Sequence, residues 1–491
     1  MKVIIEKLQS RGHQVTVVRT NDSWYIQETS PLYTSITLEV DSGFSKDFIT
    51  SFVDHLLSIH REGNAAWTRF KLKMEQGQKA SLLHEKTAKL LQSMFEKKNL
   101  VESLLRAKYD LVLTDPAVPG GVILAGYLKL PVVFNVRWTS HGEGHFAIAP
   151  SPLSYVPMTG TEFSDKMSFF QRVLNVLAFV FENYQIANYI TPHYRGLINK
   201  YLGPDVNYYS LFQKADLWLM RVDFVFEFPR PTMPNVIYIG GFQCQPAKPL
   251  PDHLEEFMQS SEKHGVILMS LGTFVSELSA DVADKIAAAF AKLPQKVIWR
   301  YKGAKPSTLG NNTLLVDWMP QNDLLGHPKM KLFVAHGGTN GVQEAMYHGV
   351  PVVGIPLFFD QYDNLKRLTD RGAAIIVQLT SVEKDNNFLE ALQEVLTNSS
   401  YRTNMQRLSR LHRDQPIAPL DNAIFWIEFV MRHKGAAHLR TESYKIPWYA
   451  YYSVDVVFFL AAVVLSNLVS LSAFIYCLCS RVCLKTKHKR D

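Results

Sequence analysis

The chain has 491 residues, of which 47% are hydrophobic and 20% are charged, and its formal net charge is +7. Its length exceeds one typical domain and suggests two, and its composition is ordinary for a globular protein with a sizeable core. The positive charge does not indicate a nucleic-acid partner, because several cations gather at the extreme C-terminus and no DNA- or RNA-reading motif occurs.

The first residues predict a helix that ends at Arg11, where Gly12 supplies a left-handed stop, and then a strand from His13 or Gln14. The chain therefore starts inside a β-α-β unit, without the strand that would precede this helix. An open doubly wound sheet places its first strand centrally, so its loss should remove an element that is buried on both faces. Charged residues interrupt any apolar run here, and no signal peptide is predicted.

The rest of the first half predicts an α/β domain with long helices over residues 79–108. Four strands are expected, near residues 15–19, 35–40, 111–114 and 132–136. Asp115 follows the third strand and precedes prolines and glycines, so it can reach a cleft, although an N-cap for the next helix is the alternative. His141 and His145 follow the fourth strand and could face the same cleft.

Residues 169–190 are rich in large apolar side chains but include Arg172 and Glu182, so we expect burial in the core rather than a membrane span. The proline-rich stretch 245–252 predicts an extended linker. Strands and helices then alternate, which predicts a parallel sheet covered by helices on both faces. The strands are expected at 266–270, 296–301 and 313–317, and the helices at 281–293, 382–397, 401–411 and around 420–432.

The stretch 318–361 carries most of the information about function. An apolar strand over residues 331–335 stops at His336, Gly337 and Gly338, and a helix begins at Thr339. Two glycines let a diphosphate approach the backbone, and the first N–H groups of the helix point at it along a favourable dipole. A plain tight turn is the alternative interpretation of the glycine pair alone.

The neighbours of this turn complete a site for a nucleotide-linked sugar. Trp318 offers a flat ring for a base, and Gln321 offers an amide to read the edge of that base. Glu344 lies one helical turn into the following helix, where a carboxylate can accept ribose hydroxyls. Asp360 and Gln361 arrive at the C-terminal end of the next strand, where they would bind sugar hydroxyls.

Residues 456–478 contain no charged side chain and are long enough to cross a hydrocarbon layer about 30 Å thick. Aromatic residues precede this segment and basic residues follow it, so the C-terminal side is expected in the cytoplasm and everything upstream in a lumen or outside the cell. Only Cys244 of the four cysteines lies upstream, and we expect no internal disulfide there. No cluster with metal-ligand spacing occurs, and we expect no metal.

The stretch 318–361 resembles the signature of the UDP-glycosyltransferases, and the similarity covers nearly the whole chain, with the strongest likeness to vertebrate UDP-glucuronosyltransferases. The motifs SLGTFV from Ser270, FEFPRPTMPNVIYIGGF from Phe226, CQPAKPLP from Cys244 and YDLVLTDP from Tyr109 resemble the same family. The resemblance implies two Rossmann-like doubly wound α/β domains that face a cleft, the GT-B arrangement, and a C-terminal transmembrane helix.

The implied organisation has seven parts. They are an acceptor-binding domain (1–244) that lacks its first strand, a linker (245–252), a UDP-sugar-binding domain (253–415), a helix returning to the first domain (416–435), a juxtamembrane segment (436–455), a transmembrane helix (456–480) and a basic cytoplasmic tail (481–491).

The resemblance also implies roles for individual residues. Trp318 and Gln321 would hold uracil, Glu344 the ribose, Ser270, His336, Gly338, Asn340 and Gly341 the diphosphate, Asp360 and Gln361 the sugar, Arg221 an acidic donor, and Asp115 would be the catalytic aspartate. The expected reaction transfers a sugar, most simply glucuronic acid, from the co-substrate UDP-sugar to a hydroxyl of a small lipophilic acceptor with inversion, without cofactor or metal. A structural salt bridge is the alternative role of Arg221.

The family pairs its aspartate with a histidine base that lies just before the first helix, and this sequence has no counterpart. Two explanations stay open. Either an active enzyme extends upstream of Met1, or this is a short form that binds UDP-sugar without turnover and modulates full-length relatives by association. His13 is expected at the surface, and a substitute base at His141 or His145 is a guess.

The resemblance further implies a single-pass protein of the endoplasmic reticulum membrane, because the ending KHKRD resembles the retrieval signals of this family. The sequons at Asn21, Asn311 and Asn398 fit a glycosylated, lumenal catalytic body. The implied partners are the UDP-sugar donor, the lipophilic acceptor, the membrane, and copies of itself or related transferases in oligomers.

Overall fold

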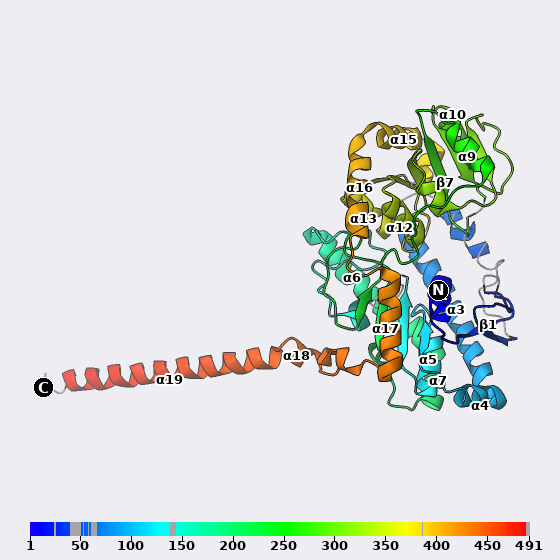
Figure 1. Cartoon of the computed structure of the whole chain (residues 1–491). Coiled ribbons are helices and arrows are strands. Elements are labelled where there is room, and N and C mark those ends of the chain that lie inside the picture. The colour runs from blue at the N-terminus through cyan, green and yellow to red at the C-terminus, as the bar shows by residue number, and fades with distance from the viewer. Residues whose placement is uncertain are drawn as a thin grey trace. The chain divides into compact units, whose positions relative to one another are not determined.

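The computed structural model divides into two compact units, Met1–Leu439 and Arg440–Asp491 (Figure 1). The residues that it describes are 1–23, 26–39, 51–52, 54–56, 58–59, 66–137, 144–275, 277–384 and 386–487. The first unit contains two regions, which we call the first half and the second half, and each has its own parallel sheet structure.

The first half begins with α1 (Lys2–Ser10), which ends where Gly12 takes a φ of +89°, as predicted. Its strands are β1 (Thr16–Thr20), β2 (Thr34–Leu38), β3 (Val112–Thr114), β4 (Val132–Val136), β5 (Leu217–Met220) and β6 (Val236–Tyr238). Its other helices are α3 (Ala66–Glu96), α4 (Lys98–Arg106), α5 (Gly120–Leu128), α6 (Phe169–Gln185), α7 (Thr191–Tyr201) and α8 (Tyr208–Gln213), with π-helical turns at Gly144–Ile148 and Ile186–Ile190.

The strands of the first half form two separate parallel sheets, β1-β2 and β3-β4-β5-β6. Within the described ranges, β1 and β3 therefore each have one edge that pairs with no strand. No described strand tests the expectation of a central strand ahead of α1. That expectation stays a prediction.

Alternate side chains of β4 and β5 enter two different cores, because successive residues of a strand point to opposite faces of the sheet. Phe134 and Trp218 pack with residues of α5, α7 and α8. Val133 and Leu219 pack with residues of α1 and of α17 (Pro419–His433). Figure 1 shows α17 beside the first-half strands, although its sequence follows the second half. The four-stranded sheet is thus covered on both faces.

The second half contains one six-stranded parallel sheet with the order β12-β11-β10-β7-β8-β9. The strands are β7 (Val266–Ser270), β8 (Lys296–Arg300), β9 (Thr313–Val316), β10 (Met330–Ala335), β11 (Val352–Gly354) and β12 (Ala374–Ile376). The helices are α9 (Asp252–Gln259), α10 (Ala280–Ala291), α11 (Gln321–Leu325), α12 (Thr339–His348), α13 (Gln361–Asp370), α14 (Leu379–Lys384), α15 (Asn387–Thr397) and α16 (Ser399–Arg413). The helix predicted over 382–397 is thus divided between α14 and α15.

This second sheet is doubly wound. Trp299 and Val334 pack with α10 and α15 on one face, and Ile298 and Phe333 pack with α12 and α16 on the other. The first strand, β7, lies in the middle, and the chain builds outward from it in both directions. The strand order therefore reverses between β7 and β10, and open α/β sheets bind ligands at the carboxyl ends of strands at such a point.

Helix α6 contradicts the prediction of burial for residues 169–185, whereas Ile186 and Ile190, which follow it, are buried as predicted. Phe169, Phe170 and Leu177 are 63%, 76% and 56% exposed, and Asn175 is the buried residue of this helix. The physical reason is that Asn175 turns inward to bind backbone: its Oδ1 accepts from Met158 N at 2.7 Å and its Nδ2 donates to Val156 O at 3.0 Å. A polar inner side chain leaves the apolar side chains facing outward.

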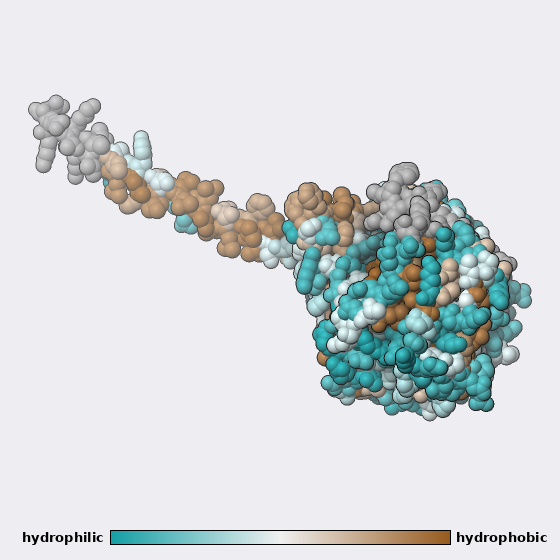
Figure 2. Space-filling model, turned by 90° about the horizontal axis from the view of Figure 1, so that it is seen from above, coloured by the Kyte–Doolittle hydropathy of each residue, from teal (hydrophilic) through white to brown (hydrophobic). Residues whose placement is uncertain are grey.

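The second unit contains short helices at Glu442–Tyr444 and α18 (Trp448–Tyr451), followed by α19 (Val454–Lys487). Within α19, residues Val454–Arg481 are long and apolar enough to cross a membrane, and the predicted span 456–480 lies inside them. Figure 2 shows the hydrophobic side chains along this helix.

Candidate active site

The carboxyl ends of β7 and β10 carry Ser270 and the loop from His336. The His336 ring lies between two glycines: a Cβ at Gly272 would come within 2.6 Å of its Cε1, and a Cβ at Gly338 would overlap its Nε2. The ring position therefore requires glycine on both sides. Burial lowers the pKa of His336, so the imidazole is neutral at pH 7 and can offer one N–H.

Helix α12 begins directly after His336, with Gly338 as its N-cap and no side chain capping the helix. The first N–H groups of α12, which belong to Thr339, Asn340 and Gly341, therefore remain available to an anion at the positive end of the helix dipole. Together with neutral His336, these groups form a cradle that can bind a diphosphate.

The residues expected to hold the nucleoside come from β9–α11 and from α12. Gln321 donates from Nε2 to Glu344 Oε2 at 2.7 Å, so the structure brings this predicted pair together. Burial raises the pKa of Glu344. Trp318 lies in the loop between β9 and α11 with its side chain 74% exposed, which leaves the ring face free to stack on a base.

Asp360 and Gln361 lie at the start of α13 and differ in what they can offer a sugar. Asp360 Oδ2 accepts from Thr339 Oγ1 and from Asn364 Nδ2, both at 2.7 Å, which ties α13 to the start of α12. Gln361 is buried, and its Oε1 accepts from the backbone N–H groups of Leu357 and Phe358. Its oxygen is therefore committed to the loop, and only its amide N–H groups remain for a ligand.

Three first-half residues follow adjacent strands of the four-stranded sheet. Asp115, Arg137 and Arg221 come directly after β3, β4 and β5. Asp115 Oδ1 accepts from Ala117 N at 2.9 Å, and Oδ2 lies 3.8 Å from Arg137 Nη2. The alternative role of Asp115 as the helix N-cap is wrong, since Pro119 occupies the N-cap of α5.

Arg221 crosses to the second half, where its Nη2 donates to Asn340 Oδ1 at 2.6 Å. Arg221 is 8% exposed, and its guanidinium lies 5.0 Å from the Phe242 ring centre. It forms no ion pair with any described residue, so the structural salt bridge that was its alternative role is not formed among those residues. Burial and nearby Arg137 lower the pKa of Arg221 to about 10. Gln343 of α12 fixes the crossing by donating to Arg221 O.

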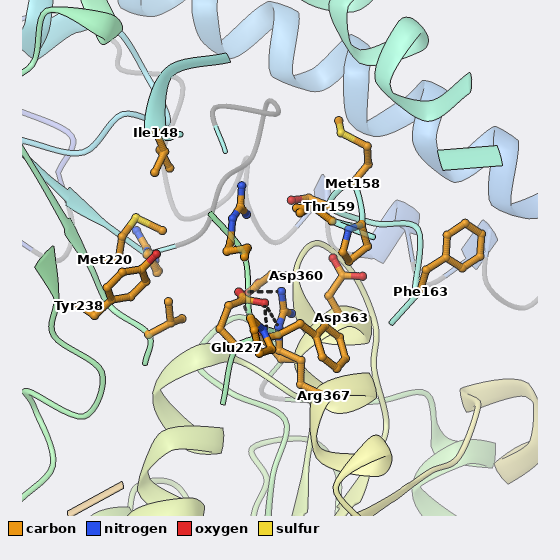
Figure 3. A pocket seen from close by; sticks show the side chains of 18 residues that line it. Ile148, Met158, Thr159, Phe163, Met220, Glu227, Tyr238, Asp360, Asp363 and Arg367 are labelled. Carbon is orange, nitrogen blue, oxygen red and sulfur yellow. Dashed lines mark hydrogen bonds and ion pairs between the residues drawn. The ribbon is translucent and has the colours of Figure 1, made fainter. Parts of the chain in front are cut away.

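A pocket lies between first-half residues and the start of α13, and Figure 3 shows its wall. Of the site residues predicted from the sequence, Asp360 lines this pocket, whereas Asp115, Arg221 and the residues expected to hold UDP do not. The first half contributes apolar side chains together with the charged Arg137, Glu227 and Arg230, and α13 and the residue before it contribute further charged ones. Members are Arg137, Ile148, Val156, Met158, Phe163, Met220 and Tyr238 from the first half, and Asp360, Asp363 and Arg367 from the second. The sequence prediction missed Arg137, Asp363 and Arg367. Arg137 carries the same signal as Asp115, a polar residue directly after a buried strand.

Of the histidines considered as substitute bases, the two that the structure describes, His13 and His145, do not line this pocket. His145 lies in the π-helical turn, its ring centre is 6.0 Å from that of Phe179, and burial lowers its pKa to about 4. His13 pairs with Glu428 of α17 at 3.0 Å. His141 lies outside the described residues.

Comparison with known proteins places this site in a family. The model of the family described as UDP-glucoronosyl and UDP-glucosyl transferase matches residues 1–490. UDP-glucuronosyltransferase 2A2 of Mus musculus is 41% identical over 476 residues, which cover 95% of this chain and 88% of that protein. UDP-glucuronosyltransferase 2B15 of Homo sapiens is 39% identical over 501 residues, which cover 100% and 93%.

Solved structures with the same fold are glycosyltransferases. The calicheamicin glycosyltransferase CalG4 has a TM-score of 0.55 at 17% identity and covers 88% of this chain and 94% of that one. A variant of Os79 from O. sativa in complex with UDP has a TM-score of 0.56 at 18% identity and covers 88% and 96%. The predicted GT-B fold is confirmed, and the chain belongs to the UDP-glucuronosyl and UDP-glucosyl transferase family.

Proposed function

We propose that this protein transfers glucuronic acid from UDP-glucuronate to a hydroxyl group of a small lipophilic acceptor, with inversion at the anomeric carbon and without a metal. The observation that carries the choice of sugar is Arg221. It is a buried cation without an ion pair among the described residues, and it reaches Asn340 at the start of the helix where the diphosphate would lie. An acidic sugar would supply the missing anion.

The donor would lie along the carboxyl edge of the second sheet. The diphosphate would accept from His336 and from the first N–H groups of α12, while Glu344 takes ribose hydroxyls and Trp318 covers the base. Asp360, already oriented by Thr339 and Asn364, would accept from hydroxyls of the sugar.

The acceptor would enter the pocket from the first half, where apolar side chains such as Ile148, Val156 and Met220 line the wall. Such a wall favours an acceptor that is mainly hydrophobic, and the polar pocket residues of α13 would lie beside its hydroxyl group, near the sugar. We infer small alcohols, phenols or steroids as acceptors.

The chemistry needs a proton to leave the acceptor hydroxyl while it attacks the anomeric carbon from the face opposite UDP. The charge that develops on the departing UDP would be stabilised by His336 and the α12 N-terminus. Asp115, with Oδ2 held only loosely by Arg137, would orient the base. Because no histidine lines the pocket among the described residues, a second candidate is a form that binds UDP-sugar without turnover and acts by associating with related transferases.

We further propose that α19 spans the membrane of the endoplasmic reticulum once, with the catalytic body lumenal and the basic tail cytoplasmic. The exposed apolar side chains of α6, which include Phe169, Phe170 and Leu177, favour a second contact with the same membrane. Replacing Phe170 and Leu177 with Asp should release a form that ends at Leu439 from sedimented membranes, while unchanged sedimentation would contradict the second contact.

The test of the reaction uses the full chain in detergent or vesicles. Calorimetry measures UDP binding, and turnover is followed with 4-methylumbelliferone as acceptor and UDP-glucuronate or UDP-glucose as donor. We expect UDP to bind and UDP-glucuronate to be at least about tenfold the better donor. UDP binding without turnover would favour the second candidate, and absent UDP binding would contradict both.

A further inference from the structure

A segment of the first half, residues 156–163, forms part of the pocket wall and is bound at both ends to other elements. Its members Val156, Met158 and Phe163 line the pocket. At its start, the Asn175 side chain of α6 binds Val156 O and Met158 N. We call this segment the wall segment.

The far end of the wall segment is bound by one carboxylate of the second half. Asp363 Oδ2 accepts from Gly160 N at 2.7 Å, and Asp363 Oδ1 accepts from Glu162 N at 3.1 Å. Both carboxylate oxygens are thus used by backbone N–H groups from the other half. Figure 3 shows Asp363 beside Thr159 and Phe163.

The backbone of the wall segment is unusual where Asp363 binds it. Gly160 has a φ of +77° and Glu162 a φ of +60°, a backbone conformation that residues other than glycine rarely adopt. Such a backbone persists where surrounding contacts fix it, and the carboxylate of Asp363 supplies contacts at both residues.

A second bond between the halves lies one helical turn further along α13. Arg367 donates from Nε and Nη2 to the two carboxylate oxygens of Glu227, each at 2.9 Å (Figure 3). Burial raises the pKa of Asp363, and the nearby Arg367 opposes that shift by favouring the charged form. The enclosed carboxylate therefore has a cation nearby, and the Glu227 contact holds α13 against the first half.

We propose that Asp363 is a positioning residue that fixes the acceptor pocket relative to the donor sugar. Asp360, the residue proposed to bind the sugar, lies one helical turn before Asp363, so the two carboxylates are joined by rigid helix. Through Asp363 the wall segment takes its position from the element that holds the donor. The proposal rests on the assignment of this pocket to the acceptor.

The consequence is coupling between the two ligands. If the wall segment is fixed through α13, UDP bound at the donor site should strengthen acceptor binding, and removal of the Asp363 contacts should abolish that effect. It should also loosen the choice between two hydroxyls of one acceptor, because the wall no longer fixes the orientation of the acceptor.

The test is Asp363→Asn in the full-length protein. The Asn side chain has nearly the same size as Asp but only one oxygen that can accept a hydrogen bond. Its NH2 group would face the backbone N–H of Gly160 or Glu162, two donors together, so one of the two hydrogen bonds is lost. The matched control is Asp370→Asn on the same helix, because Asp370 lies at the surface and pairs only with Lys366 among the described residues.

We expect UDP affinity to stay within about twofold of the wild type in both variants. We also expect the acceptor KM of Asp363→Asn, and its Kd for 4-methylumbelliferone in the presence of UDP, to rise about tenfold or more. Acceptor binding by fluorescence needs no turnover, so it separates a failure of this proposal from a failure of the proposed reaction. An unchanged acceptor Kd, or an equal loss of UDP and acceptor affinity, would overturn the proposal.

A second variant guards against misfolding. At Gly160 an added Cβ would meet only the end of Lys73, at 3.8 Å, so Gly160→Ala strains the backbone without a clash. Gly160→Ala should weaken acceptor binding in the same direction. Because both changes act on one contact, the double variant should lose little more than Asp363→Asn alone, and additive losses would contradict the shared contact.

Discussion

The two halves of the body show the same architecture but assemble their site residues differently. In the second half, one continuous sheet carries a site drawn mostly from a single stretch, from Trp318 to Gln361. In the first half, the four-stranded sheet carries site residues that are far apart in sequence, from Asp115 to Arg221. The donor side is therefore local in sequence, and the acceptor side exists only after folding.

The comparison teaches where substitutions should act. Changes at the second-half residues proposed to hold the nucleotide should affect UDP binding and turnover together. Changes in the first half should spare UDP binding and affect turnover or the choice of substrate. Four predictions test this division, beginning with the largest expected effect.

Asp115→Asn should lower kcat by about a hundred- to ten-thousandfold, because an amide cannot orient and stabilise a base that becomes charged. UDP affinity measured by calorimetry should not change, since the contacts of Asp115, with Ala117 and Arg137, lie within the first half. Asp110→Asn is the control, because Asp110 is an exposed partner of Lys434. Equal turnover in the two variants would remove Asp115 from the mechanism.

Stability at low pH should depend on two partly buried histidines, one in each half. Burial lowers the pKa of His145 in the first half to about 4, and burial likewise lowers that of His348 in the second half to about 4. The unfolded chain binds these protons near pH 6.5, so the free energy of unfolding should fall as pH falls from about 6.5 to about 4.

For His145 the loss amounts to about 2–3 kcal/mol, and it should be smaller for the more exposed His348. Replacing His145 or His348 with Gln should flatten the pH dependence of the melting temperature, more strongly for His145, as measured by calorimetry between pH 4 and 7. A slope that neither variant changes would show that other groups control acid stability.

Gly338→Ala should lower kcat/KM for the donor by about a hundredfold, roughly 2.7 kcal/mol, because the added Cβ displaces the His336 ring from the diphosphate. UDP affinity should fall with it. Gly196→Ala is the control, since a Cβ at that helical position meets nothing within 4 Å. If Gly338→Ala binds UDP normally, His336 does not hold the diphosphate.

Arg221→Gln should change the choice of donor more than the rate. We expect kcat/KM for UDP-glucuronate to fall about tenfold or somewhat more, while UDP-glucose is affected less than about threefold, because only the acidic sugar loses a charged partner. Arg106→Gln is the control, as Arg106 is a surface residue that pairs with Glu102. Equal losses with both donors would assign Arg221 to the diphosphate or to the fold.

The sequence predicted the second half well because its strands are buried on both faces and read as continuous apolar runs. The predicted strand 266–270 coincides with β7. The helix predicted to start at Thr339, after the glycine turn, is α12, which starts at that residue. What the pattern could not indicate is that the oxygen of Gln361 is occupied by Leu357 N and Phe358 N. Sequence order shows which residues are near, but not which atoms are already bound.

The first half was harder to predict for two physical reasons. The burial of residues 169–190 was inferred from apolar content, yet within α6 it is Asn175 that faces the interior, and of the predicted segment only the end, with Ile186 and Ile190, is buried apolar core. The contact of Asp363 with Gly160 joins positions 203 residues apart, and a backbone N–H leaves no trace in residue identity. A hydrogen bond between a side chain and a backbone group far away in the sequence cannot be predicted from the spacing of residues.

One buried amide gives a particular opportunity for evolution. Asn175 belongs to a helix whose outer surface is apolar, yet it fixes the start of the segment that encloses the acceptor. A change at this position, or in the turn that it binds, would reshape the enclosure without altering any group that meets the substrate. New substrate preferences could thus arise from behind the pocket, while the nucleotide side stays constant.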